Sequence, residues 1–102
     1  MLTTLAVSVP VIVGNIEAQG FSQICDGVYA SGVPVLDLET APDKSHEIIS
    51  SHLQKMAVER PSNAVVLGCA GMTNIWNKLQ QDHQITLIDP VAAAAKLIPV
   101  LV

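Results

Sequence analysis

Short apolar runs alternate along the chain with segments in which apolar residues follow a helical period. The runs have the length of single β-strands and cover residues 1–6, 27–30, 63–67 and 85–88. The run at 63–67 is almost continuously apolar, which is typical of a strand that is covered on both faces. The pattern therefore predicts four strands in a sheet that helices bury.

Two segments carry the clearest helical period. Between Thr40 and Pro61 one apolar stripe recurs every three or four positions, and Pro61 ends the helix. The stripe expected to face inward consists of Ile49, Leu53, Met56, Ala57 and Arg60. A helix after Cys69 is expected to bury Met72, Ile75, Trp76 and Leu79 and to show Asn77, Lys78, Gln80 and Gln81 to water.

The first and last helices are less amphipathic. Ser8 is a candidate N-cap for a helix over residues 11–18. Residues 91–98 form an Ala-rich helix that is apolar nearly all round, which predicts burial on more than one side. Pro34 cannot donate to a sheet ladder, so residues 33–39 are expected to cross the molecule as an irregular extended segment.

Strand and helix alternate throughout, which predicts an α/β domain with one four-stranded parallel sheet and right-handed crossovers. In such sheets ligands bind at the carboxyl ends of the strands. Thr3, Thr4 and Cys69 stand at predicted strand ends, so they are candidates for one site. For the two threonines, ordinary β-propensity is an equally good explanation.

Composition narrows the classes of function. The 102 residues are 50% hydrophobic and 14% charged, which is typical of one packed domain. The net charge is −4 and the five basic residues are scattered, so there is no basic patch for nucleic acid. No apolar run is long enough to span a membrane, and the first residues lack a basic signal region. We therefore expect a cytoplasmic protein with Cys25 and Cys69 as free thiols.

Residues 65–72, Val-Val-Leu-Gly-Cys-Ala-Gly-Met, lead a strand through a glycine-flanked cysteine into a helix. A cysteine acts as a base or nucleophile only as the thiolate, which a helix N-terminus stabilises. Gly68 and Gly71 allow a tight turn and a close approach of ligand, and the N–H groups of residues 69–72 can bind a carboxylate or oxyanion. The alternative is that Cys69 is a small buried residue at the end of a core strand.

Other polar side chains favour structural roles. Cys25 lies between a helix and a strand and is expected to be a structural thiol. His46 and His52 do not share one face of a helix, and His83 lies in a polar turn, so we expect solvated or cap-proximal histidines and no metal site. Asp89 is expected to cap the following helix.

Three further blocks accompany the cysteine segment. They are Thr3-Thr4-Leu5 with Ser8-Val9-Pro10, then Gly32-Val33-Pro34-Val35-Leu36, and last Ile88-Asp89 with Val91-Ala92-Ala93-Ala94. Together with Leu-Gly-Cys-Ala-Gly-Met at 67–72, these blocks resemble the hydantoin racemase branch of the aspartate/glutamate racemase superfamily over nearly the whole chain. Pro90 stands where that family more often has glycine, which changes a turn but no catalytic group.

The resemblance implies a fold and a chemistry. Members of the family need no cofactor, and they bind substrate between two similar flavodoxin-like α/β domains. One cysteine from each domain faces the stereocentre; one removes the α-proton and the other returns it from the opposite side. The resemblance makes Cys69 the second-domain cysteine acting on a hydantoin, allantoin or amino-acid-like substrate. It places backbone contacts to substrate at Gly68, Ala70 and Gly71, and the rim of the cleft at Thr3, Thr4 and Ser8.

The resemblance covers one domain of two. The resemblance implies that residues 1–102 correspond to the second domain and residues 90–102 to a helix that packs on the first domain. On this interpretation we expect the chain to lack the first domain and its cysteine. We therefore expect a truncated racemase that is weak or inactive alone. A partner chain, or a homodimer that sets two Cys69 thiols across one cleft, would complete it. The alternatives are a single-cysteine lyase resembling arylmalonate decarboxylase and a non-catalytic module that binds a small anion.

Overall fold

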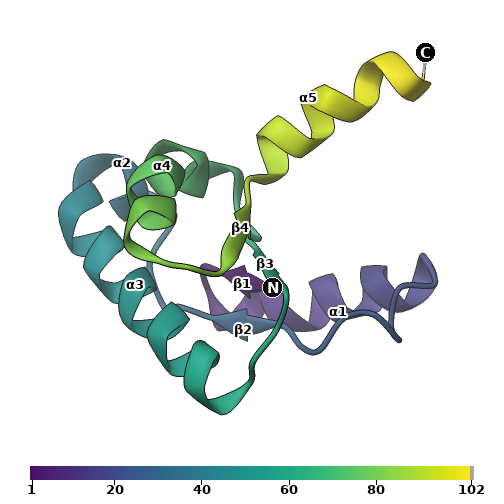
Figure 1. Ribbon diagram of the computed structural model, residues 1–102, viewed down its shortest axis with the longest axis horizontal. Helices are drawn as coiled ribbons and strands as arrows, with labels where there is room; N and C mark the ends of the chain where they lie inside the picture. The colour runs from purple at the N-terminus through teal and green to yellow at the C-terminus, as the bar shows by residue number, and fades with distance from the viewer. Residues whose placement is uncertain (102) are drawn as a thin grey trace.

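The computed structural model describes residues 1–101, which fold into short parallel strands and flanking helices (Figure 1). In chain order the elements are β1 (Leu2–Thr3), the 3-10 helix η1 (Ala6–Ser8), α1 (Val9–Ala18), β2 (Tyr29–Ala30), α2 (Asp37–Thr40), α3 (Pro42–Glu59), β3 (Ala64–Val66), the 3-10 helix η2 (Ala70–Met72), α4 (Thr73–Asp82), β4 (Thr86–Ile88) and α5 (Pro90–Leu101). The predicted alternation of strand and helix is confirmed.

The strands pair as two parallel sheets, β1 with β2 and β3 with β4. One bridge between Leu2 and Leu67 connects them, beside which the Gly68 N–H donates to the Leu2 carbonyl at 2.7 Å. The parallel α/β class is confirmed, but the prediction of one four-stranded sheet was wrong. The reason is the length of β1, which ends at Thr3 before the chain turns into η1, so that little of it lies beside β3.

The core lies between the strands and the helices on one side of them. Figure 1 shows α2, α3 and α4 together on this side, with α1 on the opposite side. The core residues are Leu2, Val33, Leu38, Ile49, Leu53, Val65, Leu67, Met72, Ile75, Leu79 and Leu87. Within residues 1–101, neither α1 nor α5 contributes a buried residue.

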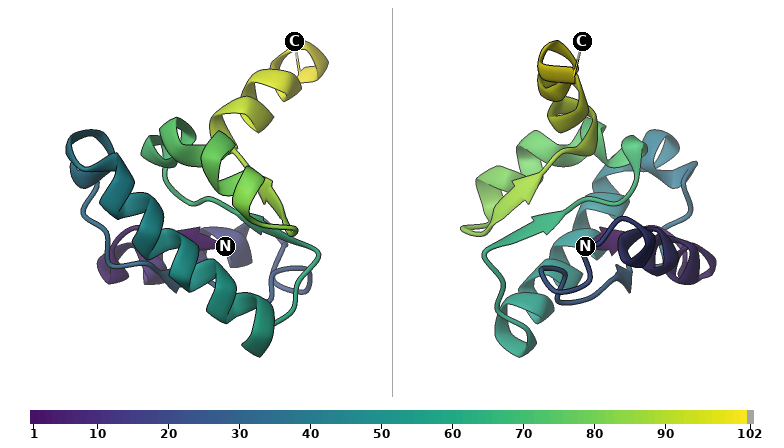
Figure 2. Two further views of the ribbon diagram at one scale, coloured as in Figure 1. Left: turned by 60° about the vertical axis from the view of Figure 1, so that its left-hand side comes forward. Right: turned by 90° about the vertical axis from the view of Figure 1, so that its right-hand side faces the viewer.

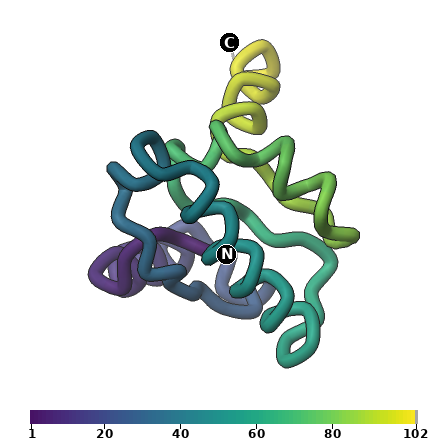
Figure 3. The backbone as a smooth tube through the Cα atoms, turned by 90° about the vertical axis from the view of Figure 1, so that its left-hand side faces the viewer, coloured from purple at the N-terminus to yellow at the C-terminus, as the bar shows by residue number. Residues whose placement is uncertain are grey.

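The last helix projects from the body of the molecule. Both views of Figure 2, and Figure 3, show α5 extending away from the other helices and strands. The prediction that residues 91–98 are buried on more than one side was therefore wrong for this chain. The apolar composition is present, but none of the described residues of α5 is buried.

The helical period predicted α3 and α4 correctly, although the stripe on α3 is shorter than expected. Ile49 and Leu53 are buried, whereas Ala57 and Arg60 are exposed. Arg60 follows the last residue of α3 and places its guanidinium 5.4 Å from the centre of the Tyr29 ring. The end of the inward stripe thus contacts β2 through a cation–π interaction instead of joining the core.

Residues 33–39 were expected to be an irregular extended segment, and this was wrong at their end. The Asp37 N–H donates to the Pro34 carbonyl at 3.0 Å, which starts the short helix α2. Leu38 is thereby buried in the core. Ser45 of α3 donates to the Asp37 carbonyl at 2.9 Å and fixes α2 against α3.

Gln80 was expected to face water, but it binds the chain at β4. Its amide donates to the Ile85 carbonyl at 2.8 Å, and its Oε1 accepts from the Leu87 N–H at 2.8 Å. Trp76 Nε1 donates to the Leu87 carbonyl at 2.7 Å. In the described structure β4 pairs with β3 alone, so its outer edge needs side-chain partners for its backbone groups.

Two of the histidines expected to be solvated or close to a helix cap join α3 to the end of α4, and His83 is the C-cap residue of α4. His46 Nε2 lies 3.0 Å from Asp82 Oδ2. His83 Nε2 lies 2.7 Å from the Ser50 hydroxyl oxygen. No group of three or more His, Cys, Asp or Glu side chains within residues 1–101 is arranged to hold a metal ion.

Candidate functional site

Cys69 lies just beyond the carboxyl end of β3. Its backbone is extended (φ −144°, ψ 131°), and it is the N-cap of η2, which continues directly into α4. Its carbonyl accepts the Met72 N–H at 3.0 Å, and its half-buried side chain packs against the core. The predicted passage from strand through cysteine into helix is confirmed. We call residues 68–72 the cysteine turn.

The two glycines of the cysteine turn are packed tightly against neighbours. A Cβ on Gly68 would lie 3.1 Å from the Thr3 Cβ, and one on Gly71 would lie 2.9 Å from the Leu38 Cδ1. Neither glycine has a positive φ. Glycine is therefore needed at both positions because a side chain has no room there. The turn lies against β1 at Gly68 and against α2 at Gly71. The sequence predicted a tight turn here but not these two neighbours.

Thr3 is the predicted site residue that the structure brings to the cysteine turn, where its hydroxyl donates to the Gly68 carbonyl at 3.3 Å. Thr4 lies beside the loop after β2. Its carbonyl accepts the Gly32 N–H at 2.7 Å and the Ser31 hydroxyl at 3.4 Å. Both threonines are buried. In this structure Thr3 holds the cysteine turn through its bond to the Gly68 carbonyl. Contact of either threonine with substrate stays a prediction.

Ser8 ends η1, which packs beside β2. It occupies the N-cap position of α1, but its side chain makes no capping hydrogen bond, so the predicted capping was wrong. Its backbone is already helical (φ −79°, ψ −20°), and a side chain caps best from an extended backbone. Its place at the rim of a substrate cleft stays a prediction.

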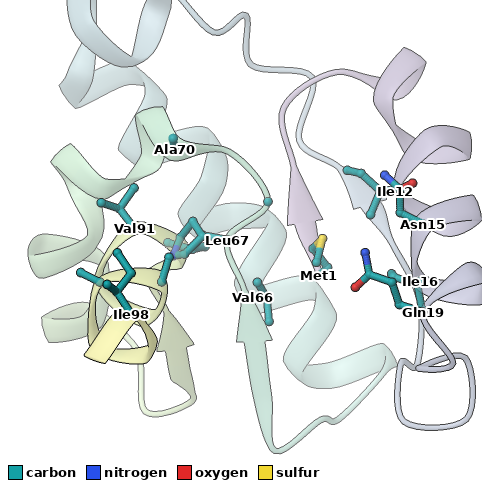
Figure 4. Close-up of a pocket in the computed structure, with 14 residues that line it drawn as sticks. Met1, Ile12, Asn15, Ile16, Gln19, Val66, Leu67, Ala70, Val91 and Ile98 are labelled. Atoms are coloured by element: carbon teal, nitrogen blue, oxygen red, sulfur yellow. The ribbon is translucent and has the colours of Figure 1, made fainter. Parts of the chain in front are cut away.

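A groove of about 740 Å³ opens beside the cysteine turn, between α1 and α5 (Figure 4). Its residues are Met1, Ile12, Asn15, Ile16, Gln19, Val66, Leu67, Gly68, Ala70, Pro90, Val91, Ala94, Ala95 and Ile98. Gly68 and Ala70, the two neighbours of Cys69, line it, and none of the lining side chains is charged. The groove is therefore a mainly apolar surface that reaches the cysteine turn, with Asn15 and Gln19 as its polar side chains.

Asp89 follows β4 and links α5 to the cysteine turn. Its Oδ1 accepts the Val91 N–H at 3.0 Å, which confirms the predicted helix cap. The same oxygen accepts the Thr73 hydroxyl at 2.7 Å. Sequence reasoning missed Thr73, because a threonine at the start of a helix gives no sign of a partner sixteen residues away.

Cys25 is half-buried, and its thiol lies 3.6 Å from the Gly27 carbonyl oxygen. Its structural role stays a prediction. No helix in the described part of the chain combines the length and apolar character needed to cross a bilayer.

The comparisons with known proteins identify the family. The model of the family described as Asp/Glu/Hydantoin racemase matches residues 1–98. The chain belongs to this family. It is 35% identical over 97 residues to a hydantoin racemase of Rhizobium meliloti, an alignment that covers 95% of this chain and 40% of the relative. A hydantoin racemase of Pseudomonas sp. is 25% identical over 85% of this chain and 35% of the relative.

Solved structures agree with this assignment. Allantoin racemase from Klebsiella pneumoniae superposes with a TM-score of 0.89 at 31% identity, covering 98% of this chain and 41% of that one. Allantoin racemase from Pseudomonas fluorescens gives a TM-score of 0.83 at 29% identity, covering 97% and 44%. The chain thus spans less than half the length of the racemases it matches.

Proposed function

We propose that this chain supplies one catalytic half of a racemase for a hydantoin-like or allantoin-like compound, with Cys69 as the proton-transfer residue. The supporting observation is the position of Cys69 at the end of β3 and at the start of the helical segment formed by η2 and α4. Family membership and the names of the relatives support the choice of racemisation and of substrate class.

The proposed step is proton transfer at a carbon next to a carbonyl group. The Cys69 thiolate takes the proton, so that the C–H bond breaks, an S–H bond forms, and the electron pair moves onto the carbonyl oxygen. Ala70 and Gly71 are the first residues of η2, so their N–H groups have no partner within the helix. These groups are suited to stabilise the oxyanion. The step uses no metal or organic cofactor.

Inversion needs a second acid on the opposite face of the substrate, because a single thiol returns the proton to the side from which it came. In our proposal this acid comes from outside the chain, either from a first-domain partner or from Cys69 of a second copy. The groove and α5 form the docking surface, as both are mainly apolar and open to solvent. The chain alone then exchanges a substrate proton slowly and inverts the centre poorly.

The test is deuterium exchange at C5 of a 5-substituted hydantoin in D2O, followed by NMR. We expect slow exchange above the buffer rate with the wild-type chain, and the buffer rate with Cys69→Ser. Cys25→Ser is the matched control and should keep the wild-type rate, because its thiol lies away from the cysteine turn on the Gly27 carbonyl. Equal rates for wild type and Cys69→Ser would contradict the proposal.

The mass of the chain in solution, measured in the same samples, identifies the source of the second acid. Inversion by a homodimer favours a second Cys69, whereas exchange without inversion by a monomer favours a first-domain partner. Cys69-dependent release of carbon dioxide from an arylmalonate, without hydantoin exchange, would replace racemisation by the lyase alternative. Binding of a small anion without either reaction would favour the binding module.

A further inference from the structure

One oxygen atom of Asp89 serves two elements that are distant in sequence. It accepts the Thr73 hydroxyl at 2.7 Å and the Val91 N–H at 3.0 Å. Thr73 is the first residue of α4, and its N–H donates to the Ala70 carbonyl, which closes the cysteine turn. Val91 lies in the first turn of α5. The carboxylate therefore holds the cysteine turn and α5 together.

The rest of α5 has little to anchor it within the described residues. It contributes no buried residue, and it projects away from the body (Figure 2). Beside its start, the Ile88 carbonyl accepts the Leu67 N–H at 3.0 Å, just before the cysteine turn. The direction of α5 therefore depends on a small region that also contains the cysteine turn.

We propose that Asp89 is a positioning residue that couples the direction of α5 to the geometry of the cysteine turn. A partner that docks along α5 shifts its first turn, and the shared oxygen transmits the shift to Thr73 and so to the turn that carries Cys69. The meaning of this coupling for catalysis rests on the proposed function. The coupling itself does not, because it follows from the two hydrogen bonds to one oxygen.

Amide hydrogen exchange measured by NMR on the full chain tests the coupling. Thr73→Val keeps the shape of the side chain but removes the hydroxyl. We expect exchange to rise about tenfold at Thr73, through local opening, and also at Val91, as for the loss of a hydrogen bond to a carboxylate. Thr73→Ser retains the hydroxyl and should restore wild-type exchange at both positions. Amides in the middle of α3 should not change.

The decisive observation is the response of α5, to which Thr73 is linked by its hydrogen bond to Asp89. An increase confined to Thr73, with Val91 unchanged, would overturn the proposal. So would Thr73→Ser behaving like Thr73→Val. If Thr73→Val does not fold, the same exchange measurement can be made on Asp89→Asn. Its Oδ1 can accept both bonds without the charge, so we expect a smaller rise of similar size at both amides, and a rise at only one would also overturn the proposal.

Alkylation of Cys69 by iodoacetamide, measured by peptide mass spectrometry, adds a readout at the thiol, and Cys25 in the same sample is the internal control. Thr73→Val should change the Cys69 rate at least about twofold, Thr73→Ser should restore it, and Cys25 should react as in wild type. An unchanged Cys69 rate would overturn the link to the thiol. Coupled amide exchange without Cys69-dependent hydantoin exchange would refute the proposed function and leave the coupling intact.

Discussion

Gly71 lies between the thiol of Cys69 and the side chain of Leu38. A Cβ at this position would come within 2.9 Å of the Leu38 Cδ1 and 3.7 Å of the Cys69 Sγ. Because Leu38 is buried, Gly71→Ala should lower the free energy of unfolding by about 1–3 kcal/mol through overpacking. Urea denaturation measures this change.

Gly14→Ala is the matched control for that substitution. A Cβ on Gly14 meets nothing within 4 Å, and the residue lies in the middle of α1. Alanine should therefore stabilise the protein by about 0.5–1 kcal/mol, since it loses less backbone entropy on folding than glycine. If Gly71→Ala were as stable as Gly14→Ala, the close packing of the cysteine turn on α2 would be wrong.

At this scale the sequence predicted the residues of the cysteine turn better than their partners. The glycines on either side of Cys69 are a local signal, and their placement in a strand-to-helix turn is confirmed. The hydrogen bond from the Thr73 hydroxyl to Asp89 and the one from the Leu87 N–H to Gln80 were missed. Both bonds join residues that only the tertiary structure brings together. In the sequence, Thr73 and Gln80 look the same as polar residues that face water.

Among the elements, α3 and the end of α4 meet at two polar pairs, His46 with Asp82 and Ser50 with His83. Burial lowers the pKa of His83 from its usual value of 6.5, the Asp82 carboxylate opposes this shift, and His46 adds to it. The unfolded chain therefore takes up a proton at His83 at a higher pH than the folded chain does. The free energy of unfolding should fall as the pH drops from 6.5 towards the lower pKa of His83 in the folded chain. Above pH 6.5 the contribution of His83 to this free energy should not change with pH.

The measurement is urea denaturation of wild type and His83→Gln at about pH 7.5 and about pH 5.5. The wild type should lose more stability than the variant between these values. His52→Gln is the control on α3 and should keep the wild-type loss. A His83→Gln variant with the full wild-type loss would show that another group causes the pH dependence.

The long periodic helices were predictable as elements, whereas the sheet was not. The stripes of α3 and α4 repeat over several turns, so their signal is strong. The strands have two or three residues each, and their ends depend on pairing between distant segments. The periodicity therefore indicated four strands but could not show that a single bridge at Leu2 and Leu67 joins two separate pairs.

For the whole molecule, the main feature is the apolar surface on α1 and α5. Both helices are rich in apolar residues and bury none of them within the described chain. We expect the isolated chain to self-associate as its concentration rises, measured by sedimentation, and Ile98→Lys to weaken the association because Ile98 lines the groove. Val58→Lys, at an exposed site on α3, is the control and should leave the self-association unchanged. Equal association of all three proteins would exclude the groove as a docking surface.

The alternation of apolar and helical segments predicted a single α/β unit, and the sequence motifs predicted its family. What covers α5 could not be predicted from periodicity, because an apolar helix gives the same pattern whether its partner is in the same chain or in another. The matched racemases are more than twice as long as this chain. Their length supports the proposal that a partner completes the site.

The most direct measurement follows one enantiomer of a 5-substituted hydantoin in D2O, with deuterium at C5 read by NMR and configuration read by chiral chromatography. We expect the wild-type chain to incorporate deuterium faster than it inverts the centre. Cys69→Ser should remove the catalysed incorporation, whereas Cys25→Ser should retain it. Equal incorporation by wild type and Cys69→Ser would show that Cys69 does not transfer the proton. Rapid inversion by a monomer would show that the chain needs no second acid from a partner.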